Sequence, residues 1–143
     1  MKKARFVADK THEWSVADDS GLCLQALDGD PGVYSARWAQ GEDLVEFTLA
    51  QMKDHANRAC YFEGCVALVS PAGQEYLFSG RVRGELSMEA RGEARTQLPY
   101  DQIFIPKGYD QTFAEMSDKL KNNMSHRGQA FEKLKKFICL ELI

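Results

Sequence analysis

Two neighbouring runs rich in β-branched, aromatic and small apolar residues place the strongest constraint on how this chain can fold. They extend from Cys60 to Val69 and from Glu75 to Val82, with Pro71, Ala72 and Gly73 between them. Residues of this kind favour strands, and Pro and Gly favour the tight turns that join strands. The sequence therefore predicts a long β-hairpin.

Helical and short extended segments are predicted on either side of this hairpin. Apolar residues recur at helical spacing in residues 2–11, 43–57 and 125–138, and Ser125 is well suited to cap the last of these helices. Short strands are expected at residues 14–17, ending at an acidic pair, and at residues 103–106. Residues 83–102 show no period, so we expect a loop, which at this length is often functional.

Composition restricts the domain count and the classes of partner. The 143 residues, 44% of them hydrophobic, suit a single domain spanning residues 1–143. A net charge of −3 leaves no general basic field for nucleic acid, and no apolar run approaches membrane-spanning length. The four cysteines form no CxxC pair, which argues against a zinc site and a disulfide framework. We expect a cytoplasmic protein that binds neither nucleic acid nor membranes.

The first candidate site is the run Asp18-Asp19-Ser20-Gly21. Carboxylates at a strand end can hold a divalent cation or activate a water molecule. The alternative is a turn in which Asp19 or Ser20 satisfies local backbone N–H groups.

The second candidate combines Lys121, Ser125, His126 and Arg127 at the start of the last helix. Free N–H groups and cations at a helix N-terminus suit phosphate oxygens, whereas cations there are unfavourable without an anion. His126 alone would more often be a hydrogen-bonded structural residue. A third pair, Tyr100-Asp101, could stack on a base and accept hydrogen bonds from it, although a Tyr before a strand usually packs in the core.

Taken in order, these fragments resemble the inosine triphosphate pyrophosphatase family. The resemblance lies in the blocks Val16 to Leu22, Asp30 to Arg37, Tyr100 to Pro106, Thr112 to Met116 and Ser125-His126-Arg127, which together cover nearly the whole chain. With the order of the segments, it implies an α/β fold whose long twisted mixed β-sheet is flanked by helices. Such enzymes cleave non-standard purine nucleoside triphosphates to a monophosphate and pyrophosphate, and use Mg²⁺.

The resemblance also implies roles for individual residues. Asp19 corresponds to the essential carboxylate that helps bind the metal and activates water, with Asp18 as a second candidate metal ligand. The nucleotide-binding residues that it implies are Ser20, Gly21, Tyr100, Asp101, Lys121, His126 and Arg127.

Two departures from the family pattern affect the expected activity. The family's first strand, its phosphate-gripping Ser/Thr-Gly-Asn-x-x-Lys loop and a metal-binding Glu have no counterpart here, because Met1 to Arg5 aligns with the end of the following helix. Leu98 also stands where the family has an aromatic residue.

Three alternatives follow: an enzyme completed by a partner subunit, a non-catalytic nucleotide-binding or interaction protein on the same scaffold, and a mis-started copy. We expect an N-terminally truncated member with reduced or lost catalysis, and a homodimer that covers the sheet edge near Trp14 and Val16.

Overall fold

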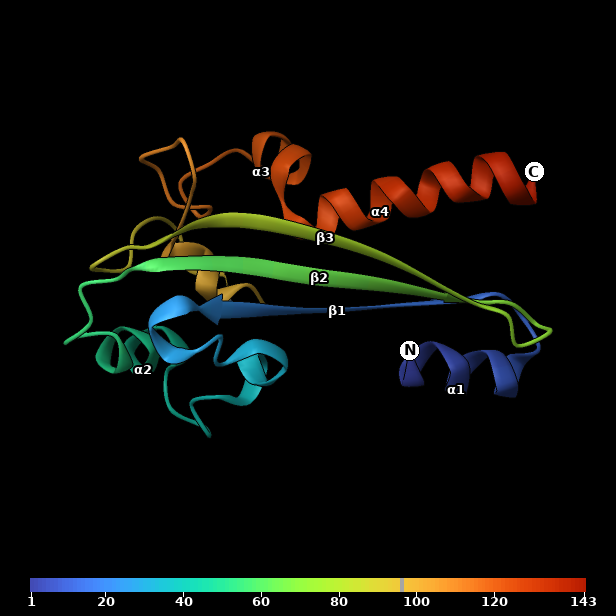
Figure 1. Cartoon of the computed structure of the whole chain (residues 1–143), viewed down its shortest axis with the longest axis horizontal. Coiled ribbons are helices and arrows are strands. Elements are labelled where there is room, and N and C mark those ends of the chain that lie inside the picture. Colours follow the sequence, from blue (N-terminus) through green and yellow to red (C-terminus); the bar gives the residue numbers. More distant parts are fainter. Residues whose placement is uncertain (96) are drawn as a thin grey trace.

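The computed structural model describes residues 1–95 and 97–143, so Thr96, one residue of the loop expected at 83–102, lies outside the described residues. Its centre is a four-stranded antiparallel sheet in the order β1 (Ser15–Leu24), β2 (Ala59–Val69), β3 (Glu75–Leu86) and β4 (Phe104–Pro106). The first three strands are long and twisted, as Figure 1 shows. The α/β class and the long twisted sheet are confirmed, but the pairings among the described strands are all antiparallel where a mixed sheet was expected.

The β2–β3 hairpin confirms the prediction made from its two β-prone runs. Its register pairs Val69 with Glu75 next to the turn and Ala59 with Glu85 at the far end. The third strand continues to Leu86, four residues beyond the expected end at Val82, and so takes over the start of the predicted loop.

β1 is longer than expected, and the acidic pair is inside it rather than at its end. The register pairs Asp18 with Val66 and Asp19 with Cys65, and continues to Leu24 opposite Cys60. The long strand β2 supplies backbone partners along this whole length, which outweighs the weak strand preference of Asp, Ser and Gly. The prediction that the pair marks a strand end was therefore wrong.

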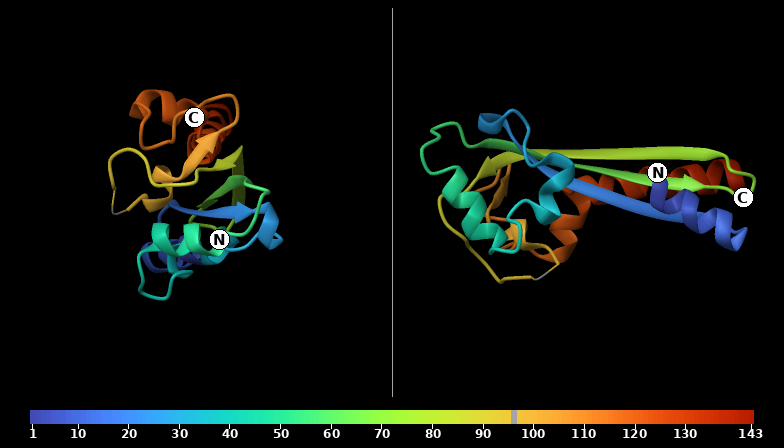
Figure 2. Two further views of the ribbon diagram at one scale, coloured as in Figure 1. Left: turned by 90° about the vertical axis from the view of Figure 1, so that its left-hand side faces the viewer. Right: turned by 90° about the horizontal axis from the view of Figure 1, so that it is seen from below.

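Two helices cover opposite faces of the sheet at the same end, as Figures 1 and 2 show. Helix α1 (Lys2–Thr11) confirms the predicted N-terminal helix and buries Ala4 and Ala8 against Ala67 and Val69. On the other face, α4 (His126–Phe137) packs against Val66 and Leu68. Alternate residues of a strand point to opposite faces, so neighbours on β2 serve different helices.

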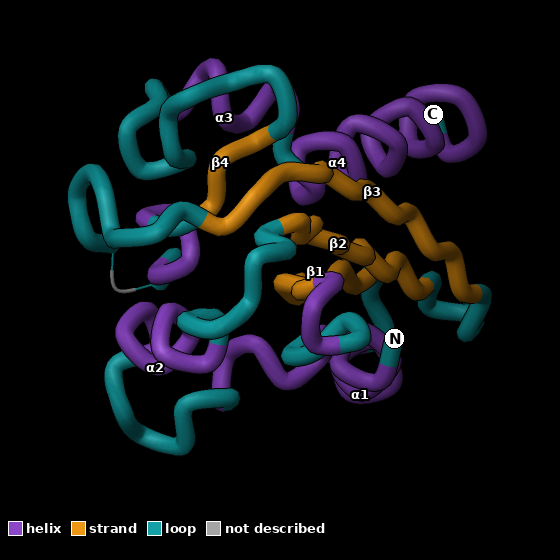
Figure 3. The backbone as a smooth tube through the Cα atoms, turned by 60° about the vertical axis from the view of Figure 1, so that its left-hand side comes forward, coloured by secondary structure: helices purple, strands orange, loops and turns teal. Residues whose placement is uncertain are grey.

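The N-terminus of α4 confirms the predicted cap, because the Ser125 hydroxyl accepts the N–H of Gly128 at 3.0 Å. A short helix that was not predicted, α3 (Asp118–Met124), lies just before it. Figure 3 shows α3 and the start of α4 near the end of the sheet where the remaining loops gather.

The largest core cluster lies at the end of the sheet away from α1, where these loops gather. Helix α2 (Leu44–Gln51) buries Val45 there, beside Leu22, Phe62 and Phe104. The helix ends at Gln51, short of the expected residue 57, and Arg58 Nη1 donates to the carbonyl of Met52 at 2.8 Å. This hydrogen bond, with the backbone N–H of His55, gives the carbonyl at the helix end its partners. No helix in the described part of the chain is long and apolar enough to cross a membrane.

Candidate functional site

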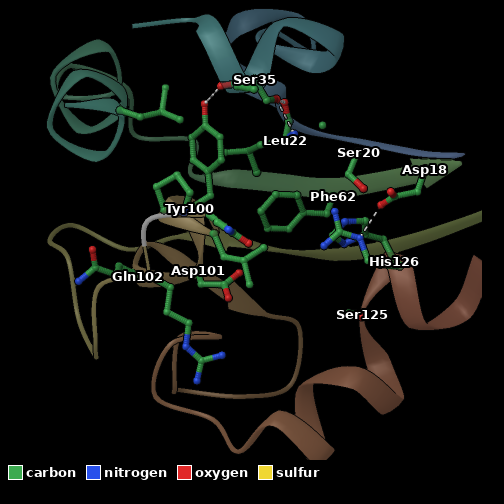
Figure 4. A pocket seen from close by; sticks show the side chains of 18 of the residues that line it. Asp18, Ser20, Leu22, Ser35, Phe62, Tyr100, Asp101, Gln102, Ser125 and His126 are labelled. Carbon is green, nitrogen blue, oxygen red and sulfur yellow. Dashed lines mark hydrogen bonds and ion pairs between the residues drawn. The ribbon is translucent and has the colours of Figure 1, made fainter. Parts of the chain in front are cut away.

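A cavity of about 1020 Å³ opens between β1, the segment 94–102 and the N-terminal end of α4. Figure 4 shows side chains from these elements facing one space. A volume of this order fits a small-molecule ligand. All the site residues predicted from the sequence line it, namely Asp18, Asp19, Ser20, Gly21, Tyr100, Asp101, Lys121, His126 and Arg127.

The two adjacent aspartates face opposite sides of the sheet. Asp18 lies on the face that α4 covers, because its register partner Val66 packs against α4. Asp19 lies on the face that α1 covers, since the next residue on that face, Ala17, pairs with Ala67 beneath α1. Both still line the cavity, because β1 is an edge strand and the cavity includes side chains from both of its faces.

Asp19 has a well-exposed carboxylate, with 71% of the side chain accessible. Its Oδ1 accepts the N–H of Ser20 at 3.2 Å, which is the local contact that the turn alternative anticipated. The same oxygen lies 3.8 Å from Nζ of Lys3 in α1. Lys3 also lines the cavity, and the sequence reasoning missed it because only the packing of α1 brings the two together.

Glycine at position 21 has a structural reason. A Cβ built there would lie 2.1 Å from the carbonyl oxygen of Gly32, so any side chain would push the segment 32–37 away from β1. The Ser35 hydroxyl of that segment accepts the N–H of Leu22 at 2.8 Å. Gly21 thus lets the cavity wall approach the strand.

The cations of the second cluster both find carboxylate partners. Lys121 is buried and forms an ion pair with Asp101, while Nε of Arg127 donates to Oδ2 of Asp18 at 2.8 Å. Burial raises the pKa of Asp101, and the hydrogen bond from Lys121 opposes that rise. Lys121 belongs to α3 rather than to the last helix, but α3 brings it to the same wall.

His126 is a buried titratable group of the cavity wall, with 8% of the residue exposed. Its ring stacks on Phe62 at a centroid distance of 4.8 Å. Burial, with help from the positive charges of Arg127 and Lys121, lowers its pKa to about 4. Nδ1 is buried and has no hydrogen-bond partner among the described residues. A neutral imidazole with a buried, unpartnered Nδ1 therefore lines the cavity.

Tyr100 contributes mainly to the core. Its hydroxyl donates to the carbonyl of Ser35 at 2.8 Å, and its ring meets Phe62 edge-on at 6.3 Å. Burial raises the pKa of this phenol to about 12. The packing alternative therefore describes most of this side chain, and half-buried Leu98 lies beside it in the cavity wall.

Comparisons with known proteins support the resemblance seen in the motifs. The Ham1 family model matches residues 1–137. The dITP/XTP pyrophosphatase of Protochlamydia amoebophila is 37% identical over 145 residues, covering 96% of this chain and 72% of that protein. The dITP/XTP pyrophosphatase of Zymomonas mobilis is 42% identical over 141 residues, covering 92% and 66%.

Solved structures agree with these sequence matches. The Ham1 protein of Staphylococcus aureus superposes with a TM-score of 0.86 at 33% identity, covering 95% of this chain and 72% of that one. A HAM1 protein of Coxiella burnetii gives 0.88 at 33% identity, covering 96% and 73%.

Proposed function

Because the chain belongs to the Ham1 family, we propose that its cavity binds non-standard purine nucleoside triphosphates, such as those of inosine and xanthosine. The observation that carries this proposal is the convergence on one cavity of an exposed carboxylate, Asp19, with the cations Lys3, Lys121 and Arg127. Cations in a concave site suit the oxygens of a nucleotide, and the carboxylate of Asp19 beside Lys3 suits hydrolysis at the phosphates.

The proposed reaction yields a nucleoside monophosphate and pyrophosphate. Asp19 takes up the proton of a water molecule whose oxygen bonds to the α-phosphorus, while the bond to the bridging oxygen breaks and pyrophosphate leaves. Lys3, whose Nζ lies 3.8 Å from Oδ1 of Asp19, places a positive charge beside this carboxylate. The same charge would attract the phosphate oxygens.

A divalent cation, Mg²⁺, fits the Asp19 side of the cavity as a shared site. The described residues contain no group of three His, Cys, Asp or Glu side chains able to hold a metal by themselves. Mg²⁺ is usually bound through one or two carboxylates with substrate phosphates and water, which an exposed Asp19 permits. Asp18, the second candidate ligand, points to the other face of β1 from Asp19, and its Oδ2 pairs with Arg127. When bound, the ion offsets charge on the phosphate oxygens.

We place the base at the α3 and α4 side, against Lys121, Asp101 and His126. The low pKa of His126 keeps its imidazole neutral at pH 7, so it offers one donor and one acceptor. Its Nδ1 is buried without a hydrogen-bond partner among the described residues, which costs free energy. A polar edge of a bound base would supply that partner. Ser20, Gly21 and Tyr100 complete the wall between the base and the phosphates.

We further propose that the 143 residues on their own have reduced or lost catalysis. The resemblance assigns a phosphate-gripping Lys loop and a metal-binding Glu to segments with no counterpart in residues 1–143. Loss of one preorganised contact commonly lowers a rate by about 100- to 1,000-fold, so several losses together leave little turnover.

Pyrophosphate release from inosine, xanthosine and guanosine triphosphates tests the reaction, and calorimetric titration of the same nucleotides tests binding. We expect binding with slow turnover that Asp19→Asn abolishes. Binding without any turnover would favour a non-catalytic nucleotide-binding protein. Absence of binding would contradict the assignment of the cavity and leave a protein-interaction role.

Assembly and location are further proposals. We propose a homodimer, because β1 is an edge strand, and Val16 in it and Trp14 just before it are 48% and 43% exposed. A monomer at all concentrations in sedimentation would contradict it. We also propose that residues 1–143 form one domain, and that its four free thiols belong in the reducing cytoplasm.

A further inference from the structure

The pair formed by Asp18 and Arg127 joins two parts of the cavity wall that are 109 residues apart in sequence. Asp18 comes from β1, and Arg127 follows His126 in the first turn of α4. Figure 4 shows Asp18 pointing towards His126. Both side chains are partly exposed, 38% for Asp18 and 45% for Arg127. The pair therefore lies where the cavity meets solvent.

The geometry of the contact leaves most of the guanidinium available. A guanidinium has five N–H donors in a fixed plane, and here Nε–H is the one that meets Asp18. Among the described residues, neither terminal nitrogen of Arg127 has a hydrogen-bond partner. A contact at Nε fixes the plane of the group without using the four terminal donors. These are the donors that grip an oxyanion in a bidentate manner.

The strand alternation separates this contact from the hydrolytic side. Asp19 points to the face of α1, where Lys3 lies beside it, whereas Asp18 points to the face of α4. A carboxylate on the α4 face cannot serve Asp19 directly, but it is placed to hold the first turn of that helix.

We propose that Asp18 is a positioning residue, whose carboxylate fixes the guanidinium of Arg127 so that its terminal nitrogens receive an anionic or carbonyl oxygen of the nucleotide. The proposal rests on the proposed nucleotide site. It gives the two adjacent aspartates separate tasks, one at the reacting phosphate and the other at the recognition of the ligand.

A double-mutant cycle measured with inosine triphosphate tests the proposal. Asp18→Ala should weaken binding by about two- to five-fold, the range expected for a partly exposed ion pair. The same change made in an Arg127→Gln background should have no further effect, because no guanidinium remains to be positioned. The affinity of Asp18→Asn, which keeps an acceptor oxygen, should fall between that of the wild type and that of Asp18→Ala. Asp19→Asn is the matched control, and its effect should be equal in both backgrounds.

The outcomes separate this role from its competitors. An effect of Asp18→Ala that persists in the Arg127→Gln background and depends on Mg²⁺ would show a metal ligand instead. Tighter binding by Asp18→Ala would show that Asp18 merely competes with the ligand for Arg127. Either result overturns the proposal.

A second measurement needs no nucleotide and so distinguishes failure of the proposal from failure of the proposed function. In the free protein labelled with ¹⁵N-arginine, the Nε–H of Arg127 should give a resonance that exchanges slowly with water. Asp18→Ala should speed that exchange, and Asp19→Asn should not. An unchanged Arg127 resonance in Asp18→Ala overturns the positioning role, whether or not inosine triphosphate binds.

Discussion

The buried imidazole of His126 makes the folded protein sensitive to acid. Burial beside Phe62 and near two cations lowers its pKa from 6.5 to about 4. As the pH falls below 6.5 the unfolded chain takes up a proton on this residue, but the folded chain does not until about pH 4. Stability must therefore decrease as the pH falls through that window.

The size of the loss follows from the shift. Each pKa unit corresponds to about 1.4 kcal/mol, so the full shift is worth about 3 kcal/mol, of which about 2 kcal/mol is lost between pH 7 and pH 4.5. Asp101 acts in the opposite sense, because its raised pKa lets the folded state bind a proton before the unfolded state does. The contribution of His126 has to be isolated by substitution.

The contribution of His126 can be isolated by urea unfolding of the wild-type chain and of His126→Gln at several pH values from 7 to 4.5. Over that range the unfolding free energy of the wild type should fall by about 2 kcal/mol more than that of the variant, because only the wild type has this titrating group. A second variant, His126→Phe, should give the same slope, whatever its absolute stability. Parallel curves for wild type and variants would refute the reasoning, since they would mean that His126 titrates equally in both states.

Further predictions follow from other contacts. Lys121→Met leaves Asp101 buried without its cation and should cost about 3–5 kcal/mol in chemical unfolding, of which Asp101→Asn in the same chain should recover part. Ser35→Ala should lower the free energy of unfolding by about 1–3 kcal/mol, because the buried N–H of Leu22 loses its acceptor. Ser35→Thr keeps a hydroxyl and should be less destabilising if that acceptor is what matters. Gly80→Ala places a Cβ 2.0 Å from a backbone oxygen of α4, so its thermal midpoint should fall clearly, and an unchanged midpoint would show that the helix can shift freely. Nucleotide affinity should fall as salt rises, in a calorimetric titration series, if the cations carry it.

The elements that could be predicted from the sequence are those with a clear hydrophobic period or turn signal, and most of the predicted site residues are charged, polar or aromatic side chains in short motifs. The N-terminal helix and the Ser125 cap stand where they were expected, and so does the hairpin apart from the longer β3, because each depends on local preferences that tertiary contacts reinforce. The length of β1 was missed, since the strand preference of Asp18 and Asp19 is weak and pairing with β2 decides it.

The site was predicted as a set of residues rather than as an arrangement. All the predicted residues line the cavity, but their partners depend on distant packing that no local pattern encodes. Lys3 meets Asp19 only because α1 docks on the sheet, and Tyr100 is drawn into the core by Ser35 and Phe62. The strand alternation that separates Asp18 from Asp19 was readable in principle, once the pair was placed inside a strand.

The close approach of α4 to β3 has a consequence for motion. At Gly80 the helix backbone lies so near the strand that a methyl group would not fit, and Gln129 Nε2 donates to the carbonyl of Arg81 at 2.9 Å. The far end of the same helix rests on separate contacts with Tyr76 and Phe78. We therefore expect a gradient of hydrogen exchange along α4, with slow amides in its first turns and faster ones towards Phe137. Local opening of the C-terminal end of α4 would then leave its first turn, which forms part of the cavity wall, in place.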